Sequence, residues 1–268
     1  MPIITLTTDF GMSDAYVGVM KGVILTIAPH VTLVDISHEV PAQDVLTASF
    51  LLYQAELYFP PDTIHIAVVD PGVGSERRAL AARTNTGIFL APDNGVLTCV
   101  LMHSANWEAY SITNAEYWLP VVSATFHGRD IFAPVGAHLA RGLPISYLGK
   151  PVDDPVLLTL PVPDFKASGE IIAHVFHIDR FGNLVLDIKA EQLPEIPVFE
   201  LAGHRIEGLR RTYADGVPDA LIAYVGSTRH HVEIALPGGD AARVTGAQIG
   251  TPVSIHNGEV TKTKWTNS

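Results

Sequence analysis

The sequence contains a single cysteine and no long apolar run. Cys99 therefore cannot form an internal disulfide bond or a metal site that needs several thiolates. It lies in the apolar stretch 96–102, where a buried, unreactive thiol is expected. No stretch reaches the roughly 18 uncharged apolar residues that a membrane-spanning helix requires. We therefore expect no membrane partner.

Basic residues are also scarce. Lysine and arginine number 17 against 28 acidic residues, which gives a net charge of −11. A nucleic-acid-binding surface needs an excess of positive charge, so we expect no nucleic-acid partner. A strand-like segment follows Met1 directly, without the basic region and cleavage site of a signal peptide. We therefore expect a cytoplasmic protein.

The first part of the chain alternates between strand and helix patterns. Ser13 or Asp14 can cap the first helix, whose apolar residues recur at spacings of three and four up to Ile27. This alternation predicts an α/β domain with a mostly parallel sheet and right-handed crossovers. The strands are expected at 2–7, 31–36, 63–69 and 87–91, and the helices at 14–27, 41–57, 96–102 and 131–140.

The pattern changes after residue 145. Prolines interrupt the segment 146–166, which we interpret as a linker between a domain at 1–145 and a second domain at 167–268. Short strands separated by turns with Gly or Pro then predict a smaller all-β, barrel-like domain. These strands are expected at 170–178, 184–188, 198–206, 220–225, 232–236 and 252–256.

The stretch from Val68 to Arg78 combines features of a binding or catalytic site. Asp70 ends an apolar strand, a turn rich in Pro and Gly follows, and two arginines close the turn. Asp9 ends the first strand in the same way. Because the carboxyl ends of parallel strands share one edge of a sheet, Asp9 and Asp70 are expected at the same edge.

Five short motifs span nearly the whole chain. They are Leu6-Thr7-Thr8-Asp9-Phe10-Gly11 with Asp14-Ala15-Tyr16-Val17-Gly18, Val69-Asp70-Pro71-Gly72-Val73-Gly74, Pro92-Asp93-Asn94-Gly95, Phe126-His127-Gly128-Arg129-Asp130, and Ile178-Asp179-Arg180-Phe181-Gly182-Asn183. In order and spacing they resemble the S-adenosylmethionine hydroxide adenosyltransferase family, also called S-adenosylmethionine hydrolases. These enzymes are related to fluorinating and chlorinating enzymes that use the same substrate.

The resemblance implies attack of water or hydroxide on the 5′ carbon of S-adenosylmethionine, which gives adenosine and methionine. It implies no cofactor and no metal. It also implies an α/β domain followed by a barrel-like domain, and a homotrimer in which the substrate lies between the N-terminal domain of one subunit and the C-terminal domain of its neighbour.

The family's catalytic triad falls on Asp70, Arg77 and His127. Arg77 and Arg78 are adjacent, and the family's spacing favours Arg77 while the residues alone leave the choice open. Asp9 corresponds to the acid that binds the ribose diol. The other implied contacts are Asp14, Asp179 and Ser227 for the methionine end, Asn183 and backbone near Leu236 for adenine, and Glu233 in the same C-terminal segment.

These residue types suit the chemistry. The leaving group is a neutral thioether, so the reaction needs a positioned oxygen nucleophile more than a general acid. Arginine stays protonated and can stabilise hydroxide-like charge, and histidine can carry a proton near neutral pH. Halogenating relatives have Tyr in place of Asp70, and fluorinating ones have Ser in place of Gly128. The absence of that hydroxyl favours water over a halide.

Two other functions fit parts of the sequence. Asp9, Asp70, His127 and Asp130 are residue types that bind hard metals, which would suit a metal-dependent phosphohydrolase. A non-catalytic module that binds adenosine or S-adenosylmethionine is the other alternative. Loss of activity with a chelator would favour the first, and binding without turnover would favour the second.

Overall fold

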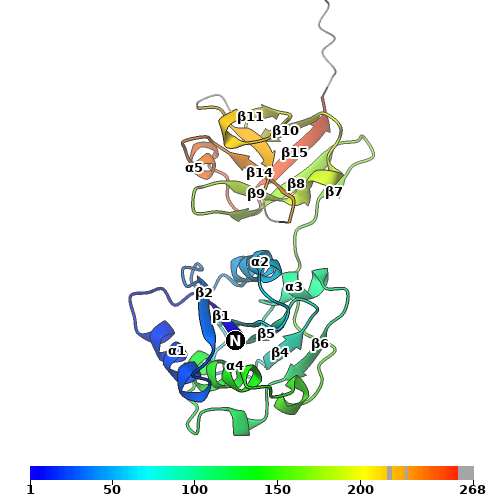
Figure 1. The fold of residues 1–268 in the computed structure, drawn as a ribbon. Helices are drawn as coiled ribbons and strands as arrows, with labels where there is room; N and C mark the ends of the chain where they lie inside the picture. Colours follow the sequence, from blue (N-terminus) through cyan, green and yellow to red (C-terminus); the bar gives the residue numbers. More distant parts are fainter. Residues whose placement is uncertain (216–218, 227–228, 259–268) are drawn as a thin grey trace, which may run out of the picture. The chain divides into compact units, whose positions relative to one another are not determined.

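Residues 1–158 form an α/β unit around a six-stranded mixed sheet (Figure 1). The computed structural model describes residues 1–215, 219–226 and 229–258, so this unit is described throughout. The strand order is β2-β1-β3-β5-β4-β6. The strands are β1 (Ile3–Thr8), β2 (Thr32–Ser37), β3 (Ile64–Val68), β4 (Ala79–Arg83), β5 (Ile88–Pro92) and β6 (Glu108–Ser111).

The predicted parallel pairing is present in four of the six strands. Strands β2, β1, β3 and β5 pair in parallel, whereas β4 and β6 add an antiparallel edge. The α/β class is confirmed, but strands β4 and β6, which form the two antiparallel pairings, were missed. β4 reads Ala-Leu-Ala-Ala-Arg, and alanine is depleted in strands, so the sequence carries little strand signal there.

Helices cover both faces of this sheet (Figure 1). α1 (Tyr16–Ile27) and α4 (Ala133–Ala140) pack against each other and share a core with Leu6 and Ile66. α2 (Val45–Ala55) contacts β1, β2 and β3 and packs against α3 (Thr98–His103). Successive side chains of a strand point to opposite faces of the sheet. The central strands therefore pack against α1 and α4 on one face and against α2 and α3 on the other.

Two predicted helix starts are wrong. α1 begins after Ala15 without a side-chain cap, so neither Ser13 nor Asp14 caps it. α2 begins after Asp44, whose carboxylate accepts from the Thr47 amide at 2.9 Å, and not at Pro41. The reason is that Gln43 adopts a left-handed backbone conformation with φ of 66°, which no α-helix can include.

Residues 159–268 form the second unit, which is described apart from 216–218, 227–228 and 259–268. Its described strands form one nine-stranded sheet in which β11 and β13, near opposite ends of the strand order, are in contact, so the sheet is barrel-like. The strands are β7 (Asp164–Phe165), β8 (Ile171–Ile178), β9 (Leu184–Lys189), β10 (Pro197–Leu201), β11 (His204–Glu207), β12 (Leu209–Arg210), β13 (Ile222–Val225), β14 (His231–Ala235) and β15 (Pro252–Asn257).

The predicted strand 198–206 is a hairpin of two strands. Ala202 and Gly203 both have positive φ, of 49° and 81°, which is the backbone that a two-residue hairpin turn requires. A short helix, α5 (Ala241–Thr245), was also missed; Asp240 caps it. Among the described residues, no helix is both long enough and apolar enough to cross a membrane.

A buried histidine links the stability of the N-terminal unit to pH. His65 in β3 is fully buried, stacks on Phe89, and shares a 2.8 Å hydrogen bond between its Nδ1 and Thr5. Burial lowers the pKa of His65 from 6.5 to about 4. The folded chain therefore keeps this ring neutral at pH values where the unfolded chain protonates it.

We expect the folded state to lose stability as the pH falls from about 6.5 to 4. In this range the unfolded chain binds the proton and the folded chain does not, so acid favours unfolding. One pKa unit corresponds to about 1.4 kcal/mol, so His65 contributes a loss of about 3 kcal/mol. Denaturant unfolding of His65→Gln at pH 7 and pH 4.5 should show a smaller pH dependence than the parent chain. Exposed His30→Gln is the control, and equal pH dependence in both variants would contradict the assignment.

Candidate active site

Two acids follow neighbouring parallel strands at one edge of the N-terminal sheet. Thr8 at the end of β1 pairs with Val68 at the end of β3, so Asp9 and Asp70 follow adjacent strand ends. The predicted meeting of these two acids at one edge is therefore present in the fold. Parallel pairing is its cause, because it aligns the carboxyl ends of both strands.

Arg77 joins Asp70 to His127. Its Nε donates to Oδ1 of Asp70 at 2.9 Å, and its Nη2 donates to Oδ2 of the same carboxylate. The same Nη2 lies 2.8 Å from Nδ1 of His127. The side chains of Asp70 and Arg77 are only 5% and 10% exposed, so this bidentate pair is shielded from water. The three residues of the predicted triad are thus in direct contact.

The turn between Asp70 and Arg77 decides which arginine enters this group. Turn hydrogen bonds from Val73 to Asp70 and from Ser75 to Gly72 bring the chain back beside its own start. Beyond the turn the chain extends into β4, where successive side chains point to opposite sides. Arg78 therefore points away from Asp70.

Arg78 has a structural role. Its Nε donates to Asp93 at 2.7 Å, and its Nη1 donates to Asp154 at 2.7 Å. Asn94, in the same turn as Asp93, donates to the carbonyl of Val69 at 2.9 Å and so supports the end of β3. The turn around Asp93 therefore stabilises the positions of Arg78 and of the end of β3, and its residues do not line the cavity.

The contact with Arg77 sets the protonation state of His127. A guanidinium can only donate, so Nδ1 of His127 must accept and the ring is neutral with its proton on Nε2. Burial first, and the positive charge of Arg77 second, lower the pKa of His127. At neutral pH the ring therefore offers an N–H donor at Nε2, and protonation at Nδ1 would break its contact with Arg77.

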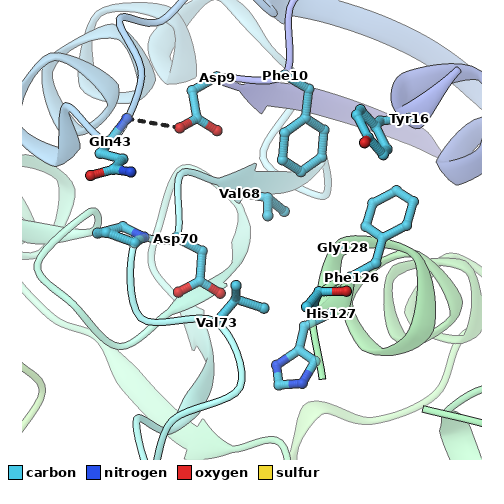
Figure 2. A pocket seen from close by; sticks show the side chains of 12 residues that line it. Asp9, Phe10, Tyr16, Gln43, Val68, Asp70, Val73, Phe126, His127 and Gly128 are labelled. Atoms are coloured by element: carbon cyan, nitrogen blue, oxygen red, sulfur yellow. Dashed lines mark hydrogen bonds between the residues drawn. The ribbon is translucent and has the colours of Figure 1, made fainter. Parts of the chain in front are cut away.

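Asp70 and His127, but not Arg77, line a cavity of about 400 Å³, a size that suits a small molecule (Figure 2). Asp9, Asp70 and His127 contribute its polar groups. An apolar wall faces them, formed by the rings of Phe10, Tyr16 and Phe126 at centroid distances of 5.3 to 5.8 Å. Phe126 contacts the other two rings edge-on, and Phe10 and Tyr16 are tilted relative to each other. The cavity therefore combines a polar end with an aromatic wall.

Gln43 was not predicted as a site residue, yet it lines the cavity (Figure 2). Its backbone N–H donates to Oδ2 of Asp9 at 2.9 Å. The left-handed backbone of Gln43 turns this N–H toward Asp9 before α2 begins. The sequence gives no signal for this contact, because it joins residues 34 positions apart through an unusual backbone conformation.

The loop that carries Asp9 is held by His38. The His38 carbonyl accepts from the Gly11 amide at 2.8 Å, and its Nδ1 lies 2.8 Å from the Thr8 hydroxyl. Its Nε2 lies 3.0 Å from Asp35, which also accepts from Lys21. Residues on both sides of Asp9 are thus fixed by one buried histidine.

Among the described residues, the other predicted site residues do not belong to the lining of this cavity. Asp14 is exposed and precedes α1. Asp179 and Asn183 flank the turn between β8 and β9, where Asp179 accepts from the amides of Phe181 and Asn183. The remaining three are Glu233 in β14, Leu236 just after β14, and Ser227, which lies outside the described residues.

The contacts of Asp70 and Asp130 do not favour the alternative function, a metal-dependent phosphohydrolase. Asp70 is engaged by Arg77, and the fully buried Asp130 is engaged by Arg129 at 2.6 Å and by the Ser123 amide at 2.8 Å. In the described part of the chain, no three His, Cys, Asp or Glu side chains form a group that could hold a metal ion. Two of the three acids that a phosphohydrolase would use, Asp70 and Asp130, are therefore engaged by arginine side chains.

Comparison with known proteins agrees with the motif analysis. Residues 4–149 match the SAM hydroxide adenosyltransferase N-terminal domain, where SAM is S-adenosylmethionine, and residues 173–254 match the corresponding C-terminal domain. An (R)-S-adenosyl-L-methionine hydrolase from Salinispora tropica is 38% identical over 260 residues, which cover 96% of this chain and 98% of the relative.

Two further relatives extend the comparison. A fluorinase from Nocardia brasiliensis is 28% identical over 293 aligned positions, which cover 96% of this chain and 97% of the fluorinase. The crystal structure of an uncharacterized conserved protein from Thermotoga maritima has a TM-score of 0.88 and 34% identity, and the match covers 96% of this chain and all of that one. The chain therefore belongs to the SAM hydroxide adenosyltransferase family.

Proposed function

We propose that this protein hydrolyses S-adenosyl-L-methionine to adenosine and L-methionine, with Asp70, Arg77 and His127 as its catalytic residues. The observation that carries the proposal is the contact of Arg77 with both Asp70 and His127 at the cavity that Asp9 also lines. This arrangement supplies an acceptor, a positive charge and an N–H donor around one small volume. Those are the groups that a water nucleophile needs.

Each group has a definite task in the proposed reaction. Asp70 accepts a hydrogen bond from the attacking water and takes up its proton as the new bond forms. Nε2–H of His127 donates to the same oxygen and fixes its direction. Arg77 holds the Asp70 carboxylate in place through its bidentate contact, and its positive charge stabilises hydroxide-like charge on this oxygen as the proton moves to Asp70.

The bond changes balance without a metal or cofactor. The water oxygen attacks the 5′ carbon, and the bond between that carbon and the sulfonium sulfur breaks. Its electron pair goes to sulfur, which leaves as the neutral thioether of methionine. The proton lost by water passes through Asp70 to solvent, so no proton has to reach the leaving group.

The packing around Gly128 is compatible with water as the nucleophile. A β-carbon at this position would lie 3.2 Å from Sδ of Met20 and 3.3 Å from the Phe126 ring. A serine here could enter only if these neighbours shifted. Gly128 therefore leaves no side-chain hydroxyl at this place in the cavity, consistent with hydrolysis and not with halide capture.

The substrate contacts belong to the same proposal. Asp9 binds the two ribose hydroxyls with the carboxylate face that Gln43 leaves free. Asp14, Asp179 and Ser227 bind the methionine end, Asn183 and the backbone near Leu236 bind adenine, and Glu233 is a further substrate-binding residue. We further propose that the protein is a homotrimer with its substrate sites at subunit interfaces, as the resemblance implies.

Incubation of the purified chain with S-adenosyl-L-methionine tests the function. We expect adenosine and methionine in equal amounts, at the same rate with and without a chelator. Loss of activity with the chelator would favour the phosphohydrolase-like alternative. Tight binding of the substrate without release of adenosine over hours would favour a binding module and refute hydrolysis.

A further inference from the structure

Asp130 is a fully buried acid that the proposed reaction does not use. It lies in a π-helical turn, Gly128–Phe132, that follows His127 and leads into α4. Nε of Arg129 donates to its Oδ1 at 2.6 Å, and Nη2 of Arg129 donates to its Oδ2 at 3.0 Å. The Ser123 amide donates to the same Oδ2 at 2.8 Å. Three donors hold this carboxylate in one orientation, so it is a fixed point for the chain around it.

Asp130 anchors the segment 119–126 at two places. Its carbonyl oxygen accepts from the Leu119 amide at 2.9 Å, and its carboxylate accepts from the Ser123 amide. The Ser123 hydroxyl in turn accepts from the Phe126 amide at 3.0 Å and so holds the chain at the end of the segment. The start, the middle and the end of this segment are therefore fixed, directly or through Ser123, by one buried residue.

The turn that carries Arg77 packs directly against this segment. Gly74 in the turn has a φ of 78°, and a β-carbon built on it would collide with the carbonyl oxygen of Ala124. The two backbones therefore touch without a side chain between them. Arg77 lies on one side of this contact and His127 follows the other side. The contact thus sets the distance that Nη2 of Arg77 bridges to Nδ1 of His127, which is 2.8 Å.

The ion pair of Arg129 and Asp130 also supports one wall of the cavity. The guanidinium carbon of Arg129 lies 5.1 Å from the centroid of the Phe126 ring, which is a cation–π contact. Phe126 lines the cavity next to His127 (Figure 2). The ion pair therefore stabilises the ring of Phe126 as well as the chain that leads to His127.

We propose that Asp130 is a positioning residue that sets the spacing between Arg77 and His127. It does so by fixing the segment against which the turn with Arg77 packs. The inference rests on the proposed function for the reaction in which this spacing matters, and on the hydrogen bonds of Asp130 and the backbone contact at Gly74 for the spacing itself. Asp9, the proposed ribose ligand, lies on another segment. A change at Asp130 should therefore act on the chemical step more than on substrate binding.

Replacement of Asp130 by asparagine should lower kcat and leave KM close to that of the parent. Asparagine has a single acceptor oxygen, so it cannot accept from both Arg129 and the Ser123 amide, and its NH₂ group must face a donor. The segment then shifts. We expect a loss of about a hundredfold in kcat, because a displacement of about 1 Å at a reacting group has this effect. Steady-state kinetics with S-adenosyl-L-methionine measure it.

Asp93→Asn is the matched control. The Asp93 carboxylate is also buried and also accepts from an arginine, Arg78, and from a backbone amide, that of Val156. Its loss should destabilise the fold to a similar extent, whereas kcat should stay close to that of the parent. Equal losses of kcat in Asp93→Asn and Asp130→Asn would reflect a general structural effect and would overturn the proposal.

Gly74→Ala tests the route through the segment. The added methyl group pushes against the carbonyl of Ala124 and so disturbs the same spacing from the other side. In a chain with both Gly74→Ala and Asp130→Asn, the loss of kcat should be smaller than the product of the two separate losses, because both act on one contact. A loss equal to the product would show that the two positions act independently, against the proposal.

A readout without turnover separates this inference from the function on which it rests. In a chain labelled with nitrogen-15 histidine, the NMR shifts of the His127 ring show which nitrogen carries the proton, and His127→Gln identifies its signals. Because Nδ1 accepts from Arg77, we expect only the Nε2–H tautomer in the parent and in Asp93→Asn, and a mixture of tautomers in Asp130→Asn. If the parent hydrolyses nothing, the proposed function fails and this comparison still decides the role of Asp130.

The same measurement remains available if Asp130→Asn does not fold. Arg129→Lys changes a side chain that is partly exposed, keeps its charge, and cannot hold both oxygens of Asp130. It should shift the tautomers of His127 in the same direction. An unchanged tautomer of His127 in the folded variant would overturn the proposal.

Discussion

Replacement of Arg77 by lysine should lower kcat by at least about a hundredfold. Lysine carries the same charge but cannot make a bidentate contact with Asp70 and also reach Nδ1 of His127. Both neighbours would then lose their orientation, and the positive charge would lose its fixed position beside them. Loss of one preorganised electrostatic group typically costs a factor of about 10² to 10³ in kcat.

The adjacent Arg78 provides a matched control. It has the same chemistry and is one position away, but its hydrogen bonds go to Asp93 and Asp154 outside the cavity. Steady-state kinetics of Arg78→Lys should therefore give a kcat within about threefold of the parent. Equal losses in both variants, or no loss at Arg77, would show that the guanidinium of Arg77 does not serve the chemical step.

Replacement of Asp9 by asparagine should raise KM by more than about a hundredfold and change kcat much less. The Gln43 amide needs an acceptor, so it will hold the oxygen of the new side chain as it now holds Oδ2 of Asp9. The NH₂ group is then turned toward the cavity, where the ribose diol requires acceptors. Two hydrogen bonds to a charged group are lost, each of which contributes about 1.5–3 kcal/mol.

Asp44→Asn is the control for this substitution. Asp44 lies next to Gln43, and its carboxylate caps α2 through Thr47 without lining the cavity. Asparagine is an equally good cap, so KM should stay close to that of the parent. A large fall in kcat with unchanged KM in Asp9→Asn would contradict a binding role and would place Asp9 in the chemical step.

The sequence predicts the elements of the site that follow from strand order. Asp9 and Asp70 each end an apolar strand, and parallel pairing alone brings them to one edge. His127 precedes a helical pattern and was assigned through the motif that contains it. The choice between Arg77 and Arg78 could not be made from the residues, since it depends on how the chain leaves the turn.

Features that depend on tertiary contacts were not predictable. Gln43 reaches Asp9 only because its backbone is left-handed, and no propensity marks a glutamine for that conformation. Tyr224 donates to Glu233 only because the pairing of β13 and β14 places the two residues opposite each other, so no local pattern predicts this hydrogen bond. Conversely, Asp14 has the residue type of a helix cap, yet α1 starts one residue later without one.

The most direct test of the account is the fate of oxygen during turnover. S-adenosyl-L-methionine is incubated with the protein in water enriched in oxygen-18, and the products are analysed by mass spectrometry. The account predicts one labelled oxygen at the 5′ position of adenosine and none in methionine. Unlabelled adenosine, or cleavage that yields no adenosine, would contradict attack by water on the 5′ carbon.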